Sequence, residues 1–295
     1  MNPIITLTTD FGSSDAYVAI MKGVILSVNP EANIVDITHS IEPQDIAQGA
    51  FILSLCYRYF PKQTIYMAIV DPGVGSERQG IIVKTSSALF VAPDNGILSY
   101  IIESNQQSAI SIESPSISPI NQATTGIERI TIKKGLEAVA ITDPHFWRHP
   151  VSSTFHGRDI FAPVAAGLSL GISPYEFGEK ITSLHVFPTP KPSLDLQGNL
   201  IGHILYIDHF GNLITDIKSG DLASICHSEH GEESPVIIEI AGRCIQGISS
   251  YYAQNEGLMA ILGSSGYLEI SLGNGSACDF LNMGVGDEIR VIPQR

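Results

Sequence analysis

The sequence predicts an N-terminal α/β domain with a mostly parallel sheet, followed by a small all-β barrel domain. Over the first hundred residues, β-branched apolar segments alternate with segments of helical period. A Pro-rich segment, residues 188–196, then interrupts the chain. After it, short apolar runs recur between turn residues, a spacing typical of a β-barrel or sandwich. We therefore expect domains at residues 1–187 and 197–295, joined by a linker at 188–196.

The elements of the first domain follow from these patterns. Its strands are expected at residues 4–8, 34–37, 64–70, 80–84 and 89–92, where apolar and β-branched residues gather. Its helices are expected at residues 15–27, 43–60 and 159–170. Pro30 and Pro61 end the first two helices, because proline cannot continue a helix. Regular patterning returns at residues 127–141.

The second domain is expected to consist of strands at residues 199–207, 212–217, 236–240, 258–262, 267–272 and 288–292. Two segments interrupt the regular patterns. Residues 104–126 are rich in Ser, Asn, Gln and Thr and hold no Lys or Arg, so we expect an exposed insertion. Residues 227–234 are acidic and include two histidines, and we expect a solvated loop there rather than a metal site.

Composition excludes several classes of protein. The 295 residues carry a formal net charge of −14, which argues against nucleic acid as a partner, because phosphate binding needs a basic face. Hydrophobic residues reach 44%, enough for a large core and for some apolar surface buried between subunits. No stretch approaches 18 apolar residues, and no signal peptide is expected. The four cysteines form no CxxC pair, which favours reduced thiols and a cytoplasmic protein.

Three polar clusters of the first domain are candidates for chemistry. Asp10 ends the first strand, where ligands sit in open α/β sheets, and its carboxylate suits a ribose diol. Asp71 and Arg78 share a Gly-rich loop after the third strand, either as an ion pair that binds a ligand or as a purely structural one. His156 directly precedes a helix, a setting that suits a general acid or base, although a lone histidine is often structural.

Two further clusters lie in the second domain, at residues 206–212 and 263–269. In the first, an Asn side chain suits a purine edge and an Asp side chain suits an ammonium group. Both clusters also contain the residue types that turns favour, so turn chemistry alone explains them equally well. Likewise, Ser14 or Asp15 before the first helix is explained by a helix cap.

Seven segments together resemble one enzyme family, the SAM hydroxide adenosyltransferases, which are related to the SAM-dependent chlorinases and fluorinases. The segments are TLTTDFGSSDAYVAIMKG, DITHSIEPQDIAQGA, IVDPGVGSERQG, FVAPDNGILS, FWRHPVSSTFHGRDIFAPVAAGLSLG, IDHFGNLITDI and GSSGYLEISLGNGSA. They cover nearly the whole chain, and residues 104–126 and 227–234 depart as insertions. The resemblance implies a homotrimer with sites between one subunit's N-domain and its neighbour's C-domain. It also implies hydrolysis of S-adenosyl-L-methionine (SAM) to adenosine and L-methionine, with no cofactor and no metal.

The resemblance implies a role for each candidate residue. The catalytic set is Asp71, Arg78 and His156, in which Asp71 and His156 hold and deprotonate water while Arg78 orients Asp71. Asp10 holds the ribose hydroxyls, and Asp15 and Asp208 are candidates for the methionine ammonium. Ser264 and Ser265 are candidates for its carboxylate. The adenine pocket is implied to hold Asn212, the main chain around Leu272 and Asn274, and Glu269.

Other functions remain as alternatives. A SAM-dependent halogenase resembles the chain at Asp10, but it carries Tyr in place of Asp71 and lacks the histidine, and a carboxylate at that place repels a halide. A non-catalytic SAM or adenosine sensor would bind the nucleoside without turnover. A nicotinamide dehydrogenase fits the α/β pattern, but the Gly-rich dinucleotide fingerprint is missing from the sequence.

Overall fold

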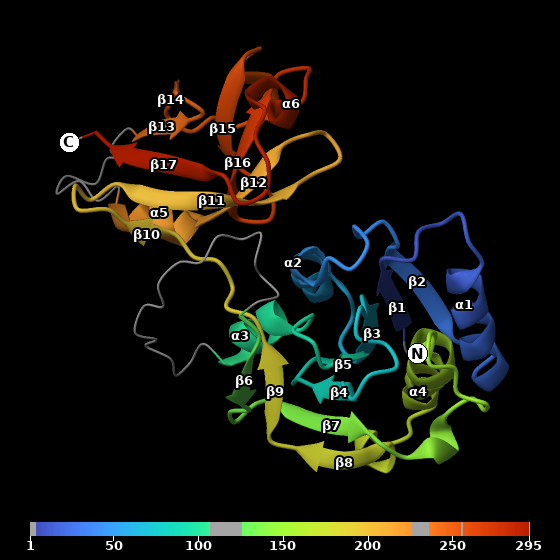
Figure 1. Ribbon diagram of the computed structural model, residues 1–295. Coiled ribbons are helices and arrows are strands. Elements are labelled where there is room, and N and C mark those ends of the chain that lie inside the picture. Colours follow the sequence, from blue (N-terminus) through green and yellow to red (C-terminus); the bar gives the residue numbers. More distant parts are fainter. Residues whose placement is uncertain (1–3, 107–125, 226–235, 255, 295) are drawn as a thin grey trace. The chain divides into compact units, whose positions relative to one another are not determined.

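The computed structural model describes residues 4–106, 126–225, 236–254 and 256–294, which form two compact units (Figure 1). The first unit ends at Pro188 and the second begins at Thr189, inside the Pro-rich segment. Within that segment, β10 (Ser193–Leu194) pairs with β11 (Leu200–Ile207), so part of the expected linker belongs to the second unit. Most of the expected insertion at 104–126 and the whole 227–234 loop lie outside the described residues.

A mixed sheet forms the centre of the first unit. Among the described residues it has seven strands in the order β2-β1-β3-β5-β4-β7-β8. They are β1 (Ile4–Thr9), β2 (Asn33–Thr38), β3 (Thr64–Ile69), β4 (Gly80–Lys84), β5 (Ala88–Pro93), β7 (Glu137–Ile141) and β8 (Gly178–Ile181). Strands β4 and β8 run opposite to the other five. The predicted α/β domain with a mostly parallel sheet is confirmed.

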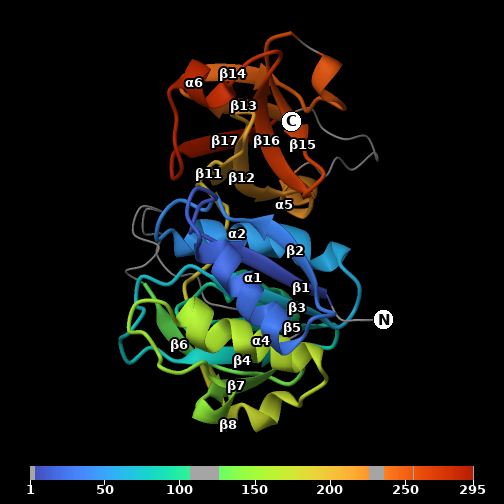
Figure 2. The same ribbon diagram turned by 90° about the vertical axis from the view of Figure 1, so that its right-hand side faces the viewer.

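Helices cover both faces of this sheet. On one face lie α1 (Tyr17–Val28) and α4 (Ala162–Ser169), side by side in Figure 2, and they pack on buried residues such as Leu7 and Met67. On the other face lie α2 (Ile46–Cys56) and α3 (Ser99–Gln106), packed on Tyr66 and Phe90. The small ladder of β6 (Glu128–Thr131) and β9 (Ser183–Val186) adjoins them.

Two expected helices differ in detail. The helix expected at 43–60 is shorter and ends in a 3₁₀ turn, Tyr57–Tyr59. The helix expected at 159–170 begins with a π-helical turn, Gly157–Phe161, before α4. Further 3₁₀ turns span Pro144–Phe146, Pro174–Glu176 and Tyr252–Gln254. Such π turns are often found at functional sites, and this one directly follows His156.

The second unit is an antiparallel, nearly closed barrel, as predicted. Its strand order in the described part is β14-β13-β17-β11-β12-β16-β15. The remaining elements are β12 (Leu213–Lys218), α5 (Ser219–Ile225), β13 (Val236–Ile240), β14 (Arg243–Gln246), β15 (Leu258–Leu262), β16 (Tyr267–Leu272), α6 (Ala277–Leu281) and β17 (Glu288–Pro293). The two end strands, β14 and β15, contact each other. Alternate residues of the strands, such as Ile204, Leu268 and Ile289, fill the interior.

Within the described ranges, no helix is both long enough and apolar enough to cross a bilayer.

Candidate active site

Arg78 joins Asp71 and His156 into one cluster in the first unit. Its Nε donates to Asp71 Oδ1 at 2.8 Å, and its Nη2 donates to Asp71 Oδ2. The same Nη2 lies 3.1 Å from His156 Nδ1. The Arg78 and Asp71 side chains are only 11% and 6% exposed, so water screens their interaction little. Arg78 is therefore in direct contact with two residues that lie 85 positions apart in the sequence.

The contact with Arg78 determines which nitrogen of His156 carries the proton. A guanidinium group has only donors, so Nδ1 of the ring must accept the hydrogen bond. In the neutral ring the proton then sits on Nε2, which is a donor. Burial, followed by the charge of Arg78, lowers the pKa of His156 from its ordinary value of 6.5. The ring is therefore neutral at pH 7 and presents an N–H group.

Two loops carry these side chains. Asp71 and Arg78 lie in the loop between β3 and β4, and His156 lies directly before the π turn Gly157–Phe161. The fully buried Asp159 anchors the second loop, because its carboxylate accepts hydrogen bonds from the Ser152 N–H at 2.9 Å and from the Arg158 guanidinium. The π turn also places the Phe161 ring 5.1 Å from the Arg78 guanidinium, a cation–π contact.

Asp10 and Asp15 belong to the same unit but form no hydrogen bond with this cluster among the described residues. Asp10 follows β1, the parallel neighbour of β3, so Asp10 and Asp71 lie at the same edge of the sheet. Its Oδ2 accepts a hydrogen bond from the Gln44 N–H at 2.8 Å. Asp15 is exposed, two residues before α1 begins.

Four of the residues predicted for substrate binding in the second unit line one cavity of about 560 Å³. They are Asp208, Asn212, Leu272 and Asn274. Three further lining residues were not predicted as site residues from the sequence: Phe210, Tyr252 and Gly275. Phe210 is 74% exposed. Its position as an aromatic residue inside a polar turn is the sequence feature that could have identified it as a binding residue. An aromatic, partly polar cavity of this kind suits a flat heterocycle.

Turn chemistry accounts for part of the Asp208 cluster. Asp208 Oδ1 accepts hydrogen bonds from the N–H groups of Phe210 and Asn212, both at 2.9 Å, and Asp208 Oδ2 accepts one from Asn212 Nδ2 at 2.8 Å. The same turn occurs at Asp195, with Asn199 in place of Asn212 and closely similar distances. Neither Asp195 nor Asn199 lines the 560 Å³ cavity. The Asp208 turn therefore differs from the Asp195 turn in bordering the cavity, and not in its own hydrogen bonds.

The predicted residue Glu269 is not among the seven residues that line the 560 Å³ cavity, but it contacts one of them, Tyr252. Its Oε2 accepts a hydrogen bond from the Tyr252 hydroxyl at 2.9 Å, and its Oε1 lies 3.5 Å from the Ser265 hydroxyl. Burial raises the pKa of Glu269, and burial together with this hydrogen bond raises the pKa of Tyr252 to about 12. Glu269 thus holds the Tyr252 hydroxyl in place. Ser264, one residue before Ser265, is exposed.

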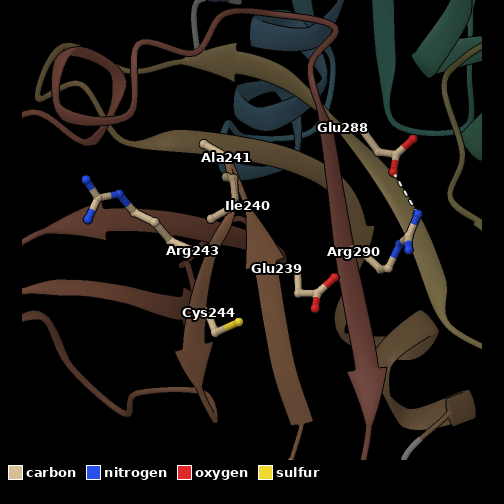
Figure 3. A pocket seen from close by; sticks show the side chains of 8 residues that line it. Glu239, Ile240, Ala241, Arg243, Cys244, Glu288 and Arg290 are labelled. Carbon is tan, nitrogen blue, oxygen red and sulfur yellow. Dashed lines mark hydrogen bonds and ion pairs between the residues drawn. The ribbon is translucent and has the colours of Figure 1, made fainter.

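A second cavity of the same unit, about 360 Å³, lies over β13, β14 and β17 (Figure 3). Its charged lining includes Arg243, Glu239 and the Glu288–Arg290 ion pair, whose charged atoms are 3.3 Å apart. None of the predicted site residues lines it. Across the described chain, no group of three or more His, Cys, Asp or Glu side chains is placed to hold a metal ion.

Comparison with protein families identifies both units. Residues 5–178 match the family described as SAM hydroxide adenosyltransferase N-terminal domain, and residues 202–290 match the corresponding C-terminal domain. A protein of Methanocaldococcus jannaschii named (R)-S-adenosyl-L-methionine hydrolase is 33% identical, with 98% of this chain and 95% of the relative aligned. A protein of the same name from Salinispora arenicola is 31% identical, with 98% and 97% aligned.

More distant relatives and solved structures agree with this assignment. A protein of Actinoplanes sp. named fluorinase is 28% identical, and the alignment covers 75% of this chain and 74% of the relative. The crystal structure of an uncharacterized conserved protein from Thermotoga maritima superposes with a TM-score of 0.81 at 30% identity, covering 98% and 99% of the two chains. The crystal structure of a conserved hypothetical protein from Thermus thermophilus gives 0.68 at 28% identity, covering 99% and 100%.

Proposed function

The chain belongs to the SAM hydroxide adenosyltransferase family, and from that premise we propose that it hydrolyses (R)-S-adenosyl-L-methionine to adenosine and L-methionine. The observation that carries the proposal is the contact of Arg78 with both Asp71 and His156. In the reaction, a water oxygen bonds to C5′ of the ribose and the C5′–S bond breaks. The bonding electron pair passes to sulfur and neutralises the sulfonium, and one water proton is released.

Methionine leaves the sulfonium centre as a neutral thioether and needs no acid catalyst. The chain's task is therefore to supply a reactive water. Asp71 takes the proton of this water, because each of its oxygens keeps a lone pair beside the hydrogen bond from Arg78. His156 holds the water oxygen through Nε2–H, since Nδ1 is occupied by Arg78. This division of roles differs from the expectation that both residues deprotonate the water. It needs no cofactor and no metal.

The remaining predicted residues bind the substrate. Asp10 accepts hydrogen bonds from the ribose hydroxyls, and Asp15 and Asp208 attract the methionine ammonium. Asp208 already accepts three hydrogen bonds, which leaves about one of its roughly four lone-pair sites for a ligand. Ser264 and Ser265 meet the methionine carboxylate.

The cavity of the second unit takes the adenine. Asn212 Nδ2 bonds to Asp208, whereas Asn212 Oδ1 has no hydrogen-bond partner within the described residues, so it is available to the amino group of adenine. Phe210 and Tyr252 supply aromatic surface for the ring, and the main chain around Leu272 and Asn274 completes the cavity.

The active form in this proposal is a homotrimer, in which the first unit of one subunit and the second unit of its neighbour share each substrate. Two observations support association of copies. The proposed catalytic residues and the cavity belong to different units. Large apolar side chains are also exposed on both units, among them Ile20, Leu26, Phe210 and Phe280. A cytoplasmic location fits the free thiols of Cys56, Cys244 and Cys278.

A product assay tests the proposed function. Purified protein is incubated with SAM in chloride buffer, and adenosine, methionine and any 5′-chloro-5′-deoxyadenosine are measured by mass spectrometry. We expect adenosine and methionine in equal amounts, with turnover reduced about 10²- to 10⁴-fold in Asp71→Asn. Asp143→Asn, the same change in an exposed ion pair with His145, is the control and leaves turnover unchanged. Bound but unconverted SAM indicates a sensor, and a chlorinated product indicates a halogenase; either contradicts the proposal.

A further inference from the structure

The loop that carries Asp71 and Arg78 spans the end of a neighbouring strand. It leaves β3 and enters β4, and β5 lies between these two strands in the sheet. Strand β5 runs parallel to β3 and antiparallel to β4. The C-terminal end of β5 and the two residues that follow it, Asp94 and Asn95, therefore lie between the two ends of the loop.

These two residues bond to both ends of the loop. The Asn95 side-chain amide donates through Nδ2 to the carbonyl oxygen of Val70 at 2.8 Å. The Asp94 N–H donates to the carbonyl oxygen of Gln79, also at 2.8 Å. Val70 is the residue before Asp71, and Gln79 is the residue after Arg78. Each contact is thus one residue away from a member of the ion pair.

Asp94 and Asn95 are themselves firmly held. Asn95 Oδ1 accepts a hydrogen bond from the Ile97 N–H at 3.2 Å. The Asp94 carboxylate is 4% exposed and accepts from the His185 backbone N–H at 2.9 Å and from its ring Nδ1 at 2.7 Å. Of these two contacts, the one to Val70 is made by a side chain, so Asn95→Ala removes it and keeps the backbone contact of Asp94 with Gln79. The same substitution also removes the hydrogen bond from the Ile97 N–H to Asn95 Oδ1.

We propose that Asn95 is a positioning residue for the reaction: its amide fixes the end of β3 and so aims the Asp71 carboxylate at Arg78 and the attacking water. The proposal rests on the proposed function. Asn95 acts through Val70, and an error of about 1 Å in the placement of a reacting group is enough to cost about 10²-fold in rate.

The test compares Asn95→Ala with Asn105→Ala. Asn105 on α3 makes the same kind of bond, from Nδ2 to the Ile101 carbonyl at 2.8 Å, but it lies away from the catalytic loops. We expect Asn95→Ala to lower kcat about 10- to 100-fold, with KM for SAM changed less than about twofold. The reason is that the Asp71 carboxylate moves while the residues that bind SAM keep their contacts. Asn105→Ala keeps the wild-type kcat and KM, and the Tm of both variants is measured beside their kinetics.

An unchanged kcat in Asn95→Ala overturns the proposal, and so does a loss of kcat in both variants that follows their loss of Tm. Absence of turnover in the wild-type protein is a failure of the proposed function instead. In that case a crystal structure of Asn95→Ala decides the positioning role, since it needs no activity. We expect the 2.8 Å contact between Arg78 Nε and Asp71 Oδ1 to lengthen beyond about 3.5 Å. An unchanged contact overturns the proposal.

Discussion

Gly75 packs against the carbonyl oxygen of Ser153 so closely that a Cβ atom at Gly75 would overlap that oxygen. At this point the loop that carries Asp71 and Arg78 meets the loop that carries His156. Gly75 also has a φ of +79°, a conformation that side-chain-bearing residues rarely adopt. The contact of Arg78 with His156 therefore depends on a glycine three residues before Arg78.

Gly75→Ala is expected to separate the two loops. The new methyl group pushes Ser153 away, Arg78 loses its contact with His156, and turnover falls about 10- to 100-fold. The left-handed backbone adds a stability cost of about 1–3 kcal/mol. Gly171→Ala is the matched control, because Gly171 has a similar φ of +87° but no atom near the position of a Cβ. It carries the backbone cost alone and keeps wild-type turnover; equal activity losses in the two variants would refute the role of the loop contact.

The environment of His156 predicts the direction of a pKa change. Burial and then the charge of Arg78 lower the pKa of His156 below 6.5. Arg78→Gln removes the positive charge, and the pKa of His156 rises. The measurement is an NMR titration of the His156 ring in both proteins, which does not require activity. A pKa that stays the same or falls in Arg78→Gln contradicts the geometry.

The two similar turns of the second unit allow a matched test of the cavity. Asn212→Ala and Asn199→Ala each remove an Asn-to-Asp hydrogen bond of nearly equal length. Only Asn212 lines the cavity, and loss of its hydrogen bond to adenine is expected to cost about 1–3 kcal/mol of binding, or about 5- to 150-fold in KM. Asn199→Ala leaves KM unchanged. Calorimetry with adenosine checks both variants, and equal affinities would place the adenine elsewhere.

His203 and Asp216 make stability depend on pH. The backbone N–H of His203 donates to Asp216 Oδ1 at 2.8 Å. The ring Nδ1 of His203 lies 3.7 Å from Oδ2 of the buried Asp216. Asp216, with a smaller effect from Glu288, raises the pKa of His203 above 6.5. The folded state thus holds the proton more tightly than the unfolded state. The resulting stabilisation is full below about pH 6.5 and is lost as the pH rises through the raised pKa.

Urea unfolding between pH 5.5 and pH 9 measures this effect. His203→Gln is expected to flatten the decline of the unfolding free energy above about pH 6.5. His209→Gln, a change in an exposed turn, keeps the wild-type slope. A wild-type slope in His203→Gln would show that another group is responsible.

The sequence predicted some features of this protein much better than others. Local periodicity was sufficient for strands such as 64–70 and for the change to a barrel after the Pro-rich segment. The resemblance to a family pointed to Asp71, Arg78 and His156, which the fold does bring together. Periodicity carries no information on contacts between distant segments. The Asn95–Val70 bond and the packing of Gly75 on Ser153 therefore became visible only in the structure.

The second unit gives two further examples of features that local sequence patterns do not reveal. The DHFGN turn at Asp208 and the DLQGN turn at Asp195 have the same local geometry, so no local pattern distinguishes the turn that borders the cavity from the one that does not. Tyr252 was missed because its link to Glu269 spans 17 residues and two elements. Glu269, expected in the adenine pocket, contacts the cavity through its hydrogen bond with Tyr252.

Incubation of the protein with SAM in ¹⁸O-labelled water shows whether water is the nucleophile at C5′. If water attacks C5′, mass spectrometry finds adenosine with one ¹⁸O atom, located at the 5′ oxygen, and Asp71→Asn forms this product about 10²- to 10⁴-fold more slowly. Adenosine without the label, or labelled adenosine formed equally fast by Asp71→Asn, would contradict the assignment of Asp71 as the residue that activates water.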